Sequence, residues 1–151
     1  MRITLDDLTD PAVVALLEGH VSQLRSISPP ESTHALDLDG LRAPGVSVWV
    51  ARDGEAVLGC GALTEVGPGH GEVKSMRTAP DARRRGVARA VLGEILAEAR
   101  RRGLTRVSLE TGSDDFFAPA RALYAAHGFT ECGPFGSYRL DPHSTFLTLA
   151  L

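Results

Sequence analysis

The first part of the chain carries one strong helical pattern. The apolar residues Val13, Leu17, Val21 and Leu24 recur at the spacing of one helix face. Asp10-Pro11 precedes them, and a capping side chain followed by proline is typical of a helix start. We therefore expect a helix over residues 11–26, with a short strand before it at residues 2–4 and a shorter helix after it around residues 34–41.

The middle of the chain changes from a strand pattern to a helical one. Apolar segments joined by glycine-containing turns predict an antiparallel meander of three strands, at residues 46–51, 56–65 and 72–78. From Gly86 to Arg102 the apolar positions follow a period of 3.6 residues, and we expect Gly103 to cap the end of that helix.

The last part of the chain predicts a strand, a helix and two further strands. The strand covers residues 106–111, the helix covers residues 119–127 and is closed by Gly128, and the last strands cover residues 129–132 and 145–151. A meander followed by helices and strands in this order indicates an α+β layer arrangement. We expect a single domain over residues 1–151.

Composition excludes several classes of protein. A chain of 151 residues with 43% hydrophobic and 23% charged residues resembles an ordinary globular domain, not a disordered chain, a collagen or a coiled coil. No apolar run is long enough to span a membrane, and the first residues lack a signal-peptide pattern. The two cysteines, Cys60 and Cys132, cannot form a disulfide framework, so a cytoplasmic protein is expected.

The net charge argues against a nucleic-acid partner. Sixteen basic and nineteen acidic residues give a formal charge of −3, whereas nucleic-acid-binding domains are usually basic. The arginine triplets at residues 83–85 and 100–102 keep that alternative open, and it would show itself in an affinity that falls steeply with salt.

The first of these triplets lies in a loop between a predicted strand and a predicted helix. The first N–H groups of a helix have no partner within the helix, and the helix dipole favours an anion near them. Gly86 and Ala88 would let a phosphate approach the backbone, and the neighbouring arginines add charge. This loop therefore predicts an anion site that suits a pyrophosphate; the alternative is a helix start with solvated arginines.

Other nucleotide and metal motifs are absent from the sequence. It contains neither a P-loop nor a GxGxxG segment after a strand, and Gly59-Cys-Gly61 lies inside a predicted strand, where glycines mark a bulge or a close backbone approach. The five histidines show no pairing at metal-ligand spacing, so no metal site is expected.

Three segments together resemble the GNAT superfamily of acyl-CoA-dependent N-acetyltransferases. Arg83-x-x-Gly86-x-Ala88 is similar to its pyrophosphate loop, Met76-Arg-Thr-Ala-Pro80 to its fourth strand, and Leu123-Tyr-x-x-x-Gly-Phe129 to its LYxxxGF segment. The resemblance implies the GNAT fold, a mixed and mostly antiparallel sheet flanked by helices. It also implies acetyl-CoA as co-substrate, bound between the fourth and fifth strands.

The resemblance implies a cofactor role for individual residues. The backbone of Met76 and Thr78 would pair with the pantetheine arm, and Tyr124 would donate a proton to the leaving thiolate. Phe117 stands where many relatives carry an asparagine that contacts CoA. The residues expected to hold the cofactor are Met76, Thr78, Arg83, Arg84, Arg85, Gly86, Val87, Ala88, Arg89 and Phe117.

The reaction also needs a base. An alkylammonium cannot attack a thioester, and a nearby carboxylate can take its proton. Glu72 is the first candidate, because it lies where some family members carry a glutamate base, and Glu110 on the next strand is the second. Strand alternation places Glu72 on one face with Lys74, Met76 and Thr78. The alternative for Glu72 is a structural ion pair with Lys74.

The acceptor is expected to be the primary amine of a small molecule that bears an acid, such as an amino acid. Ser28 and His34 would form one wall of its pocket, Phe135, Tyr138 and Arg139 the other, and Glu110 would take part. A non-catalytic acyl-CoA-binding or regulatory module is the alternative function, and Phe117 is its only sequence support. The last strand, at residues 145–151, could support a homodimer by edge pairing or exchange.

Overall fold

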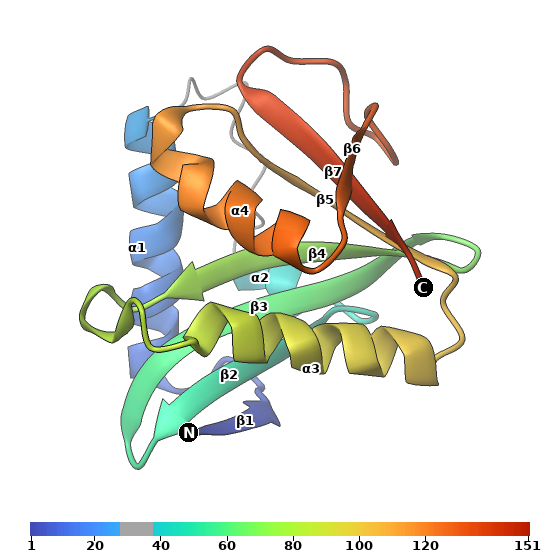
Figure 1. Ribbon diagram of the computed structural model, residues 1–151. Coiled ribbons are helices and arrows are strands. Elements are labelled where there is room, and N and C mark those ends of the chain that lie inside the picture. The colour runs from blue at the N-terminus through green and yellow to red at the C-terminus, as the bar shows by residue number, and fades with distance from the viewer. Residues whose placement is uncertain (28–37) are drawn as a thin grey trace.

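Seven strands form one sheet in the computed structural model, which describes residues 1–27 and 38–151 (Figure 1). The strands are β1 (Arg2–Leu5), β2 (Ser47–Asp53), β3 (Ala56–Gly67), β4 (His70–Thr78), β5 (Arg106–Gly112), β6 (Thr130–Cys132) and β7 (Ser144–Ala150). The helices are α1 (Pro11–Ile27), α2 (Leu38–Leu41), α3 (Val87–Arg101) and α4 (Ala118–Ala126), with short 3-10 turns η2 (Pro80–Ala82) and η3 (Asp115–Phe117).

The sheet order is β1-β2-β3-β4-β5-β7-β6. All neighbouring strands are antiparallel except β4 and β5, which are parallel. The expected α+β class with a mixed, mostly antiparallel sheet is therefore confirmed. The strand β7 lies between β5 and β6, so both of its edges are already paired. Edge pairing of a second copy through this strand is therefore ruled out, because in this sheet the edge strands are β1 and β6, whereas a homodimer formed by strand exchange stays a prediction.

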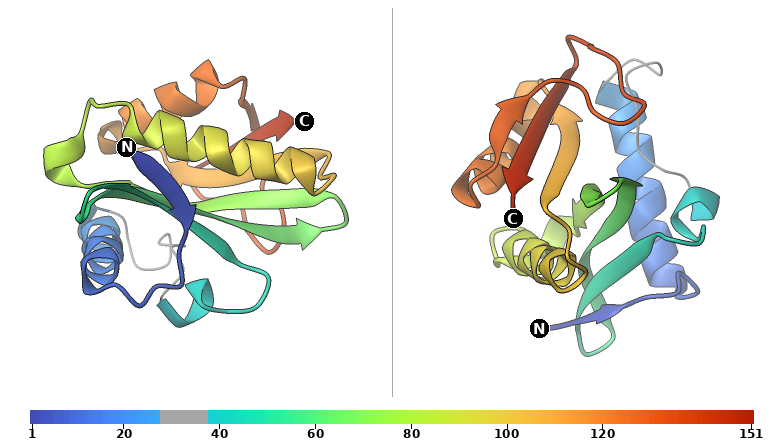
Figure 2. Two further views of the ribbon diagram at one scale, coloured as in Figure 1. Left: turned by 90° about the horizontal axis from the view of Figure 1, so that it is seen from below. Right: turned by 90° about the vertical axis from the view of Figure 1, so that its right-hand side faces the viewer.

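The helices cover both faces of the sheet. Figures 1 and 2 show α3 and α4 on one face and α1 and α2 on the other. The apolar stripe of α3 is fully buried against the sheet, with Val91 and Ile95 at 0% exposure. Gly61 on β3 lets this helix approach closely, because a Cβ there would overlap Ile95 and press against Val91. The sequence prediction that the paired glycines mark a close approach is confirmed.

Local signals place most helix ends correctly. The side chain of Asp10 accepts a 2.9 Å hydrogen bond from the backbone N–H of Ala12, so it caps α1 as predicted. Gly103 and Gly128 follow α3 and α4 with positive φ, the usual conformation at a helix C-terminus. The helix expected around residues 34–41 is present as α2 from Leu38, and residues 34–37 lie outside the described part.

One feature of the sheet creates space for a site. The parallel pairing of β4 with β5 covers only three residue pairs and ends where Glu72 faces Ser108. Beyond that point β4 continues to Thr78 and β5 to Gly112 without pairing to each other. Backbone groups that would otherwise bond across the sheet are thus directed into the gap between the two strands.

Candidate active site

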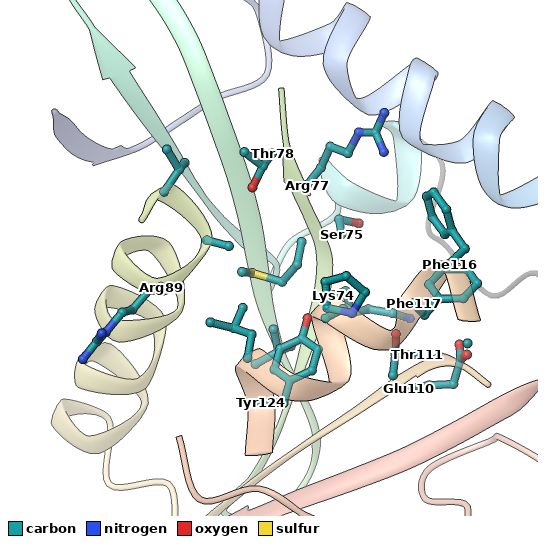
Figure 3. A pocket seen from close by; sticks show the side chains of 18 of the residues that line it. Lys74, Ser75, Arg77, Thr78, Arg89, Glu110, Thr111, Phe116, Phe117 and Tyr124 are labelled. Atoms are coloured by element: carbon teal, nitrogen blue, oxygen red, sulfur yellow. The ribbon is translucent and has the colours of Figure 1, made fainter. Parts of the chain in front are cut away.

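A cavity of about 670 Å³ occupies the gap between β4 and β5. We call it the cleft. Its walls are β4, the turn and helix start that follow β4, the end of β5, and α4 (Figure 3). Of the residues expected to hold a cofactor, all but one line it: Met76, Thr78, Arg83, Arg84, Gly86, Val87, Ala88, Arg89 and Phe117. The exception is Arg85, whose guanidinium lies 3.8 Å from the carboxylate of Asp53 at the end of β2.

The start of α3 forms one end of the cleft. Gly86 is the N-terminal cap residue, with φ of 76°, and as a glycine it has no side chain that could accept a hydrogen bond from the first turn of the helix. A Cβ at Gly86 would meet nothing within 4 Å, and residues 86–89 line the cleft, so this helix start borders open space. Arg83 and Arg84 are exposed beside it. Open helix N–H groups flanked by guanidinium groups fit a phosphate-bearing ligand.

The second arginine triplet is far from the first. Residues 83–85 precede α3 and residues 100–102 end it, so they are separated by the length of a 15-residue helix. Arg101 and Arg102 each form a 2.8 Å ion pair with Glu98. The two triplets therefore do not combine into one basic surface.

A bulge in β4 changes which side chains face the cleft. Opposite Cys60 to Ala62 of β3, the strand β4 advances by three residues instead of two, and Ser75 has φ of 55°. Met76 consequently packs on the α3 side of the sheet, while Glu72 lies on the opposite face. The expectation that Glu72 and Met76 share one face is wrong, because the extra residue breaks the alternation.

Glu72 is buried and its carboxylate is held by two neighbours. The Tyr138 hydroxyl donates a 2.5 Å hydrogen bond to its Oε2, and the ammonium of Lys74 lies 3.5 Å from the same oxygen. The Lys74 ammonium also lies 5.7 Å from the centre of the Tyr138 ring. The ion pair with Lys74, which was the alternative interpretation of Glu72, is present, and Tyr138 adds a donor from the connection between β6 and β7.

Glu110 lies in the opened part of the cleft, two residues beyond the last pairing of β5 with β4 (Figure 3). Burial raises the pKa of its carboxyl to about 7, and the negative charge of Glu72 acts in the same direction. A carboxyl group with a pKa near 7 can exchange protons at neutral pH. The structure thus brings both predicted acidic residues to the cleft, in different electrostatic environments.

Tyr124 projects from α4 into the cleft, as Figure 3 shows. Its side chain is almost completely buried, and its ring packs edge-on against Phe129 at 5.7 Å between centroids. Burial raises the pKa of its hydroxyl above the ordinary value, so the group remains protonated at neutral pH. It can therefore donate a proton but does not ionise spontaneously.

Phe117 ends the turn between β5 and α4 and is buried. Its ring covers Gly112 so closely that a Cβ at Gly112 would overlap it. Phe116 packs edge-on against it, with ring centroids 5.0 Å apart. The aromatic residue that departs from the family pattern is thus an ordered part of the cleft wall.

Of the residues predicted for the acceptor pocket, the structure describes only some, and not all of these line the cleft. Ser28 and His34 lie outside the described residues. Tyr138 lines the cleft, whereas Arg139 lines a second, adjacent cavity. Phe135 lines neither cavity and packs instead against His70 and Phe146, with centroids 5.7 and 6.1 Å away.

Sequence reasoning missed much of the wall that α4 and its neighbours provide. Helical spacing on α4 could have indicated its inward face, but the end of β5 faces the cleft only because that strand leaves β4. The missed lining residues include Thr111, Gly112, Phe116, Pro119, Ala120, Leu123 and His143.

Within residues 1–27 and 38–151, we find no group of three metal-ligating side chains and no helix able to cross a membrane.

Comparison with known proteins gives consistent matches. Residues 13–129 match the model of the Acetyltransferase (GNAT) family. The chain is 53% identical over 149 residues to the uncharacterized N-acetyltransferase YedL of Escherichia coli, covering 99% of this chain and 94% of that protein. It is 43% identical over 137 residues to the IAA acetyltransferase of Azospirillum brasilense, covering 90% and 88%.

A solved structure also matches over the whole chain. It is an acetyltransferase from Bacillus subtilis in complex with CoA, 16% identical, with a TM-score of 0.72 and coverage of 99% and 98%. At this identity the match concerns the fold, and it confirms the architecture expected from the sequence.

Proposed function

The chain belongs to the GNAT acetyltransferase family and is an acetyl-CoA-dependent acyltransferase, and from this premise we propose that it acetylates the primary amine of a small molecule. The observation that carries the proposal is the continuity of the cleft. One cavity connects the open start of α3 with the buried hydroxyl of Tyr124 and the carboxyl of Glu110. The relative named IAA acetyltransferase supports an acceptor that is a small molecule.

The α3 end of the cleft would bind the pyrophosphate of acetyl-CoA. The N–H groups after Gly86 supply hydrogen-bond donors, and the exposed guanidinium groups of Arg83 and Arg84 supply positive charge. The part of β4 that does not pair with β5, from Val73 to Thr78, would bond to the pantetheine arm as an added strand does. Bound acetyl-CoA supplies an activated acetyl group as its thioester.

Glu110 is the better base of the two carboxylates. Both close neighbours of Glu72 contact the same carboxylate oxygen, so this side chain is already engaged in a hydrogen bond and an ion pair within the protein. Glu110 lies beside the gap, and its pKa of about 7 matches the task of accepting a proton from an amine at neutral pH. We therefore assign Glu110 as the base, with a pKa that is raised mainly by burial and further by the negative charge of Glu72.

Tyr124 would act as the acid. Direct attack by the amine nitrogen on the acetyl carbon forms the new C–N bond and breaks the C–S bond, and the sulfur then needs a proton. The Tyr124 hydroxyl is protonated at neutral pH and points into the cleft from α4. The ammonium form of the acceptor loses two protons: Glu110 would take one before the attack, and the second, released as the amide forms, would replace the proton that Tyr124 gives to sulfur, so protons and charges balance. Holding both reactants in one cavity supplies much of the rate acceleration.

Calorimetric titration with acetyl-CoA tests this proposal. The matched variants are Gly86→Asp and Gly86→Asn, which have similar size and both tolerate a positive φ. We expect the wild type and the Gly86→Asn variant to bind acetyl-CoA, and the aspartate variant to lose binding because its charge repels a pyrophosphate. Absence of binding to the wild type, or equal binding by both variants, would contradict the proposed position of the cofactor.

A further inference from the structure

A second cavity, of about 510 Å³, lies next to the cleft. It is bounded by β3 and β4 on one side and by the connection between β6 and β7 on the other. Its lining residues are Val66, Glu72, Lys74, Gly136, Ser137, Tyr138, Arg139, Leu140 and Asp141. Its volume falls within the range of small-molecule sites.

The two cavities share three side chains. Glu72, Lys74 and Tyr138 line both, so these residues form a common wall. They are bonded to one another through the Tyr138 hydroxyl and the Lys74 ammonium, both on Glu72. A molecule that extends past this wall would have one end in each cavity, and Glu110 would face the end that lies in the cleft.

The charged residues of the second cavity differ in whether they already have a partner within the protein. Lys74 is paired with Glu72, and the Asp141 carboxylate accepts a 2.8 Å hydrogen bond from the backbone N–H of His143. Arg139 is exposed, and within residues 1–27 and 38–151 its guanidinium has neither an ion pair nor a hydrogen bond. It is the cation of this cavity that is available to a ligand anion.

The remaining lining favours a ligand with an apolar portion. Val66 and Leu140 contribute aliphatic side chains, and 86% of Leu140 is exposed. The ring of Tyr138 adds an aromatic surface. Burial of apolar ligand surface against these side chains would favour binding.

We propose that the second cavity binds the acid group of the acceptor, with Arg139 as the residue that holds it. The substrate class is therefore a primary amine joined to a carboxylate through an apolar chain of several bonds, as in an ω-amino acid, because the amine and the carboxylate must reach opposite sides of the common wall. Its amine would pass the common wall and face Glu110 in the cleft. This inference rests on the proposed function, because it concerns the acceptor of the same reaction.

The test compares acceptors with and without the acid group. Thiol release from acetyl-CoA is measured with ω-aminohexanoate and ω-aminooctanoate, and with pentylamine and heptylamine, which lack only the carboxylate. A phosphonate analogue of ω-aminohexanoate distinguishes a general anion site from one shaped for a carboxylate. The variants are Arg139→Gln, Arg139→Lys and, as a control, Arg100→Gln, an exposed arginine near the end of α3 that lines neither cavity.

We expect the wild type to prefer the amino acids. Arg139→Gln should raise KM for them by about tenfold or more, because a charge-assisted hydrogen bond is lost. KM for the two simple amines should stay unchanged, and Arg139→Lys should recover part of the preference. Arg100→Gln should resemble the wild type with every acceptor.

Two other results would overturn the inference in different ways. If Arg139→Gln affects acids and simple amines alike, or affects neither, Arg139 does not bind the acid group, although the acetyltransferase proposal stands. If acetyl-CoA binds but none of these amines releases thiol, the proposed small-amine acceptor fails and the inference fails with it. A phosphonate used as well as the carboxylate would overturn only the restriction to carboxylates.

Discussion

The hydroxyl of Tyr138 donates a 2.5 Å hydrogen bond to Oε2 of Glu72, a residue that is only 3% exposed. The two residues are 66 positions apart in the chain, so this bond joins the connection between β6 and β7 to the central strand β4. The Tyr138 ring also packs against Phe146 of β7, with centroids 5.6 Å apart. The contact therefore fixes the wall between the two cavities.

Removing this hydroxyl should destabilise the protein. Tyr138→Phe leaves Glu72 buried with one donor fewer, and we expect the free energy of unfolding to fall by about 1–3 kcal/mol. Urea denaturation measures this loss. In a double-mutant cycle with Glu72→Gln, the two losses should not be additive. Simple additivity would show that the bond contributes nothing to stability.

Activity should depend on the ionisation of Glu110. Its carboxyl must be deprotonated to act as a base, so Glu110 should contribute a rise of kcat/KM with pH that levels off above about 7, in addition to the rise caused by deprotonation of the acceptor amine. Glu110→Gln should lower kcat/KM by about 10²-fold and remove this rise. Because the acceptor amine also titrates, the wild-type and variant profiles are compared with the same amine. An unchanged profile in the variant would assign the proton transfer elsewhere.

The ionisation of Glu110 should also make the free energy of unfolding depend on pH. The pKa of Glu110 is raised from 4.5 to about 7 in the folded protein, so the folded state holds this proton more tightly than the unfolded state does. The contribution of Glu110 to stability should therefore fall as the pH rises from about 4.5 to about 7. Comparing urea denaturation of the wild type and Glu110→Gln across this range isolates the effect, and parallel curves would contradict it.

Tyr124→Phe separates catalysis from binding. The variant keeps the ring that packs against Phe129 but lacks the proton donor. We expect kcat to fall by about 10²-fold, with the Kd for acetyl-CoA nearly unchanged. Steady-state kinetics and calorimetry measure the two quantities. A variant with normal kcat would remove Tyr124 from the acid role.

Gly112 should tolerate no larger side chain. In Gly112→Ala the new Cβ would overlap the Phe117 ring, and we expect a loss of about 1–3 kcal/mol in the free energy of unfolding. Affinity for acetyl-CoA should fall as well, because Phe117 lines the cleft. The matched control is Gly93→Ala on α3, where a Cβ meets nothing within 4 Å and should stabilise the helix by about 0.5–1 kcal/mol.

A second substitution tests the cause of that loss. If steric overlap is responsible, Gly112→Ala should cost less in a Phe117→Ala background than in the wild type. The same cost in both backgrounds would show that the ring of Phe117 is not the obstacle.

Local patterns in the sequence predicted the helices and strands, and they also predicted the end of the candidate site at the start of α3. Periodicity predicted α1 and α3, Asp10 and Gly103 predicted helix ends, and the loop at Gly86 predicted a start of α3 that is open to an anion. These features depend on neighbouring residues, because helix spacing, caps and turn conformations act over a few positions. Tyr124 and Glu110 were identified through the resemblance to a family and from the strand neighbouring Glu72.

Only the tertiary structure decided how the remaining parts meet. The bulge at Ser75 separates Met76 from the face of Glu72, and strand alternation alone could not reveal an extra residue. The insertion of β7 between β5 and β6 removes it from the sheet edge. The bond between Tyr138 and Glu72, and the burial that raises the pKa of Glu110, likewise come from segments far apart in the chain. Register and burial depend on packing across the whole sheet, and a local pattern does not contain that information.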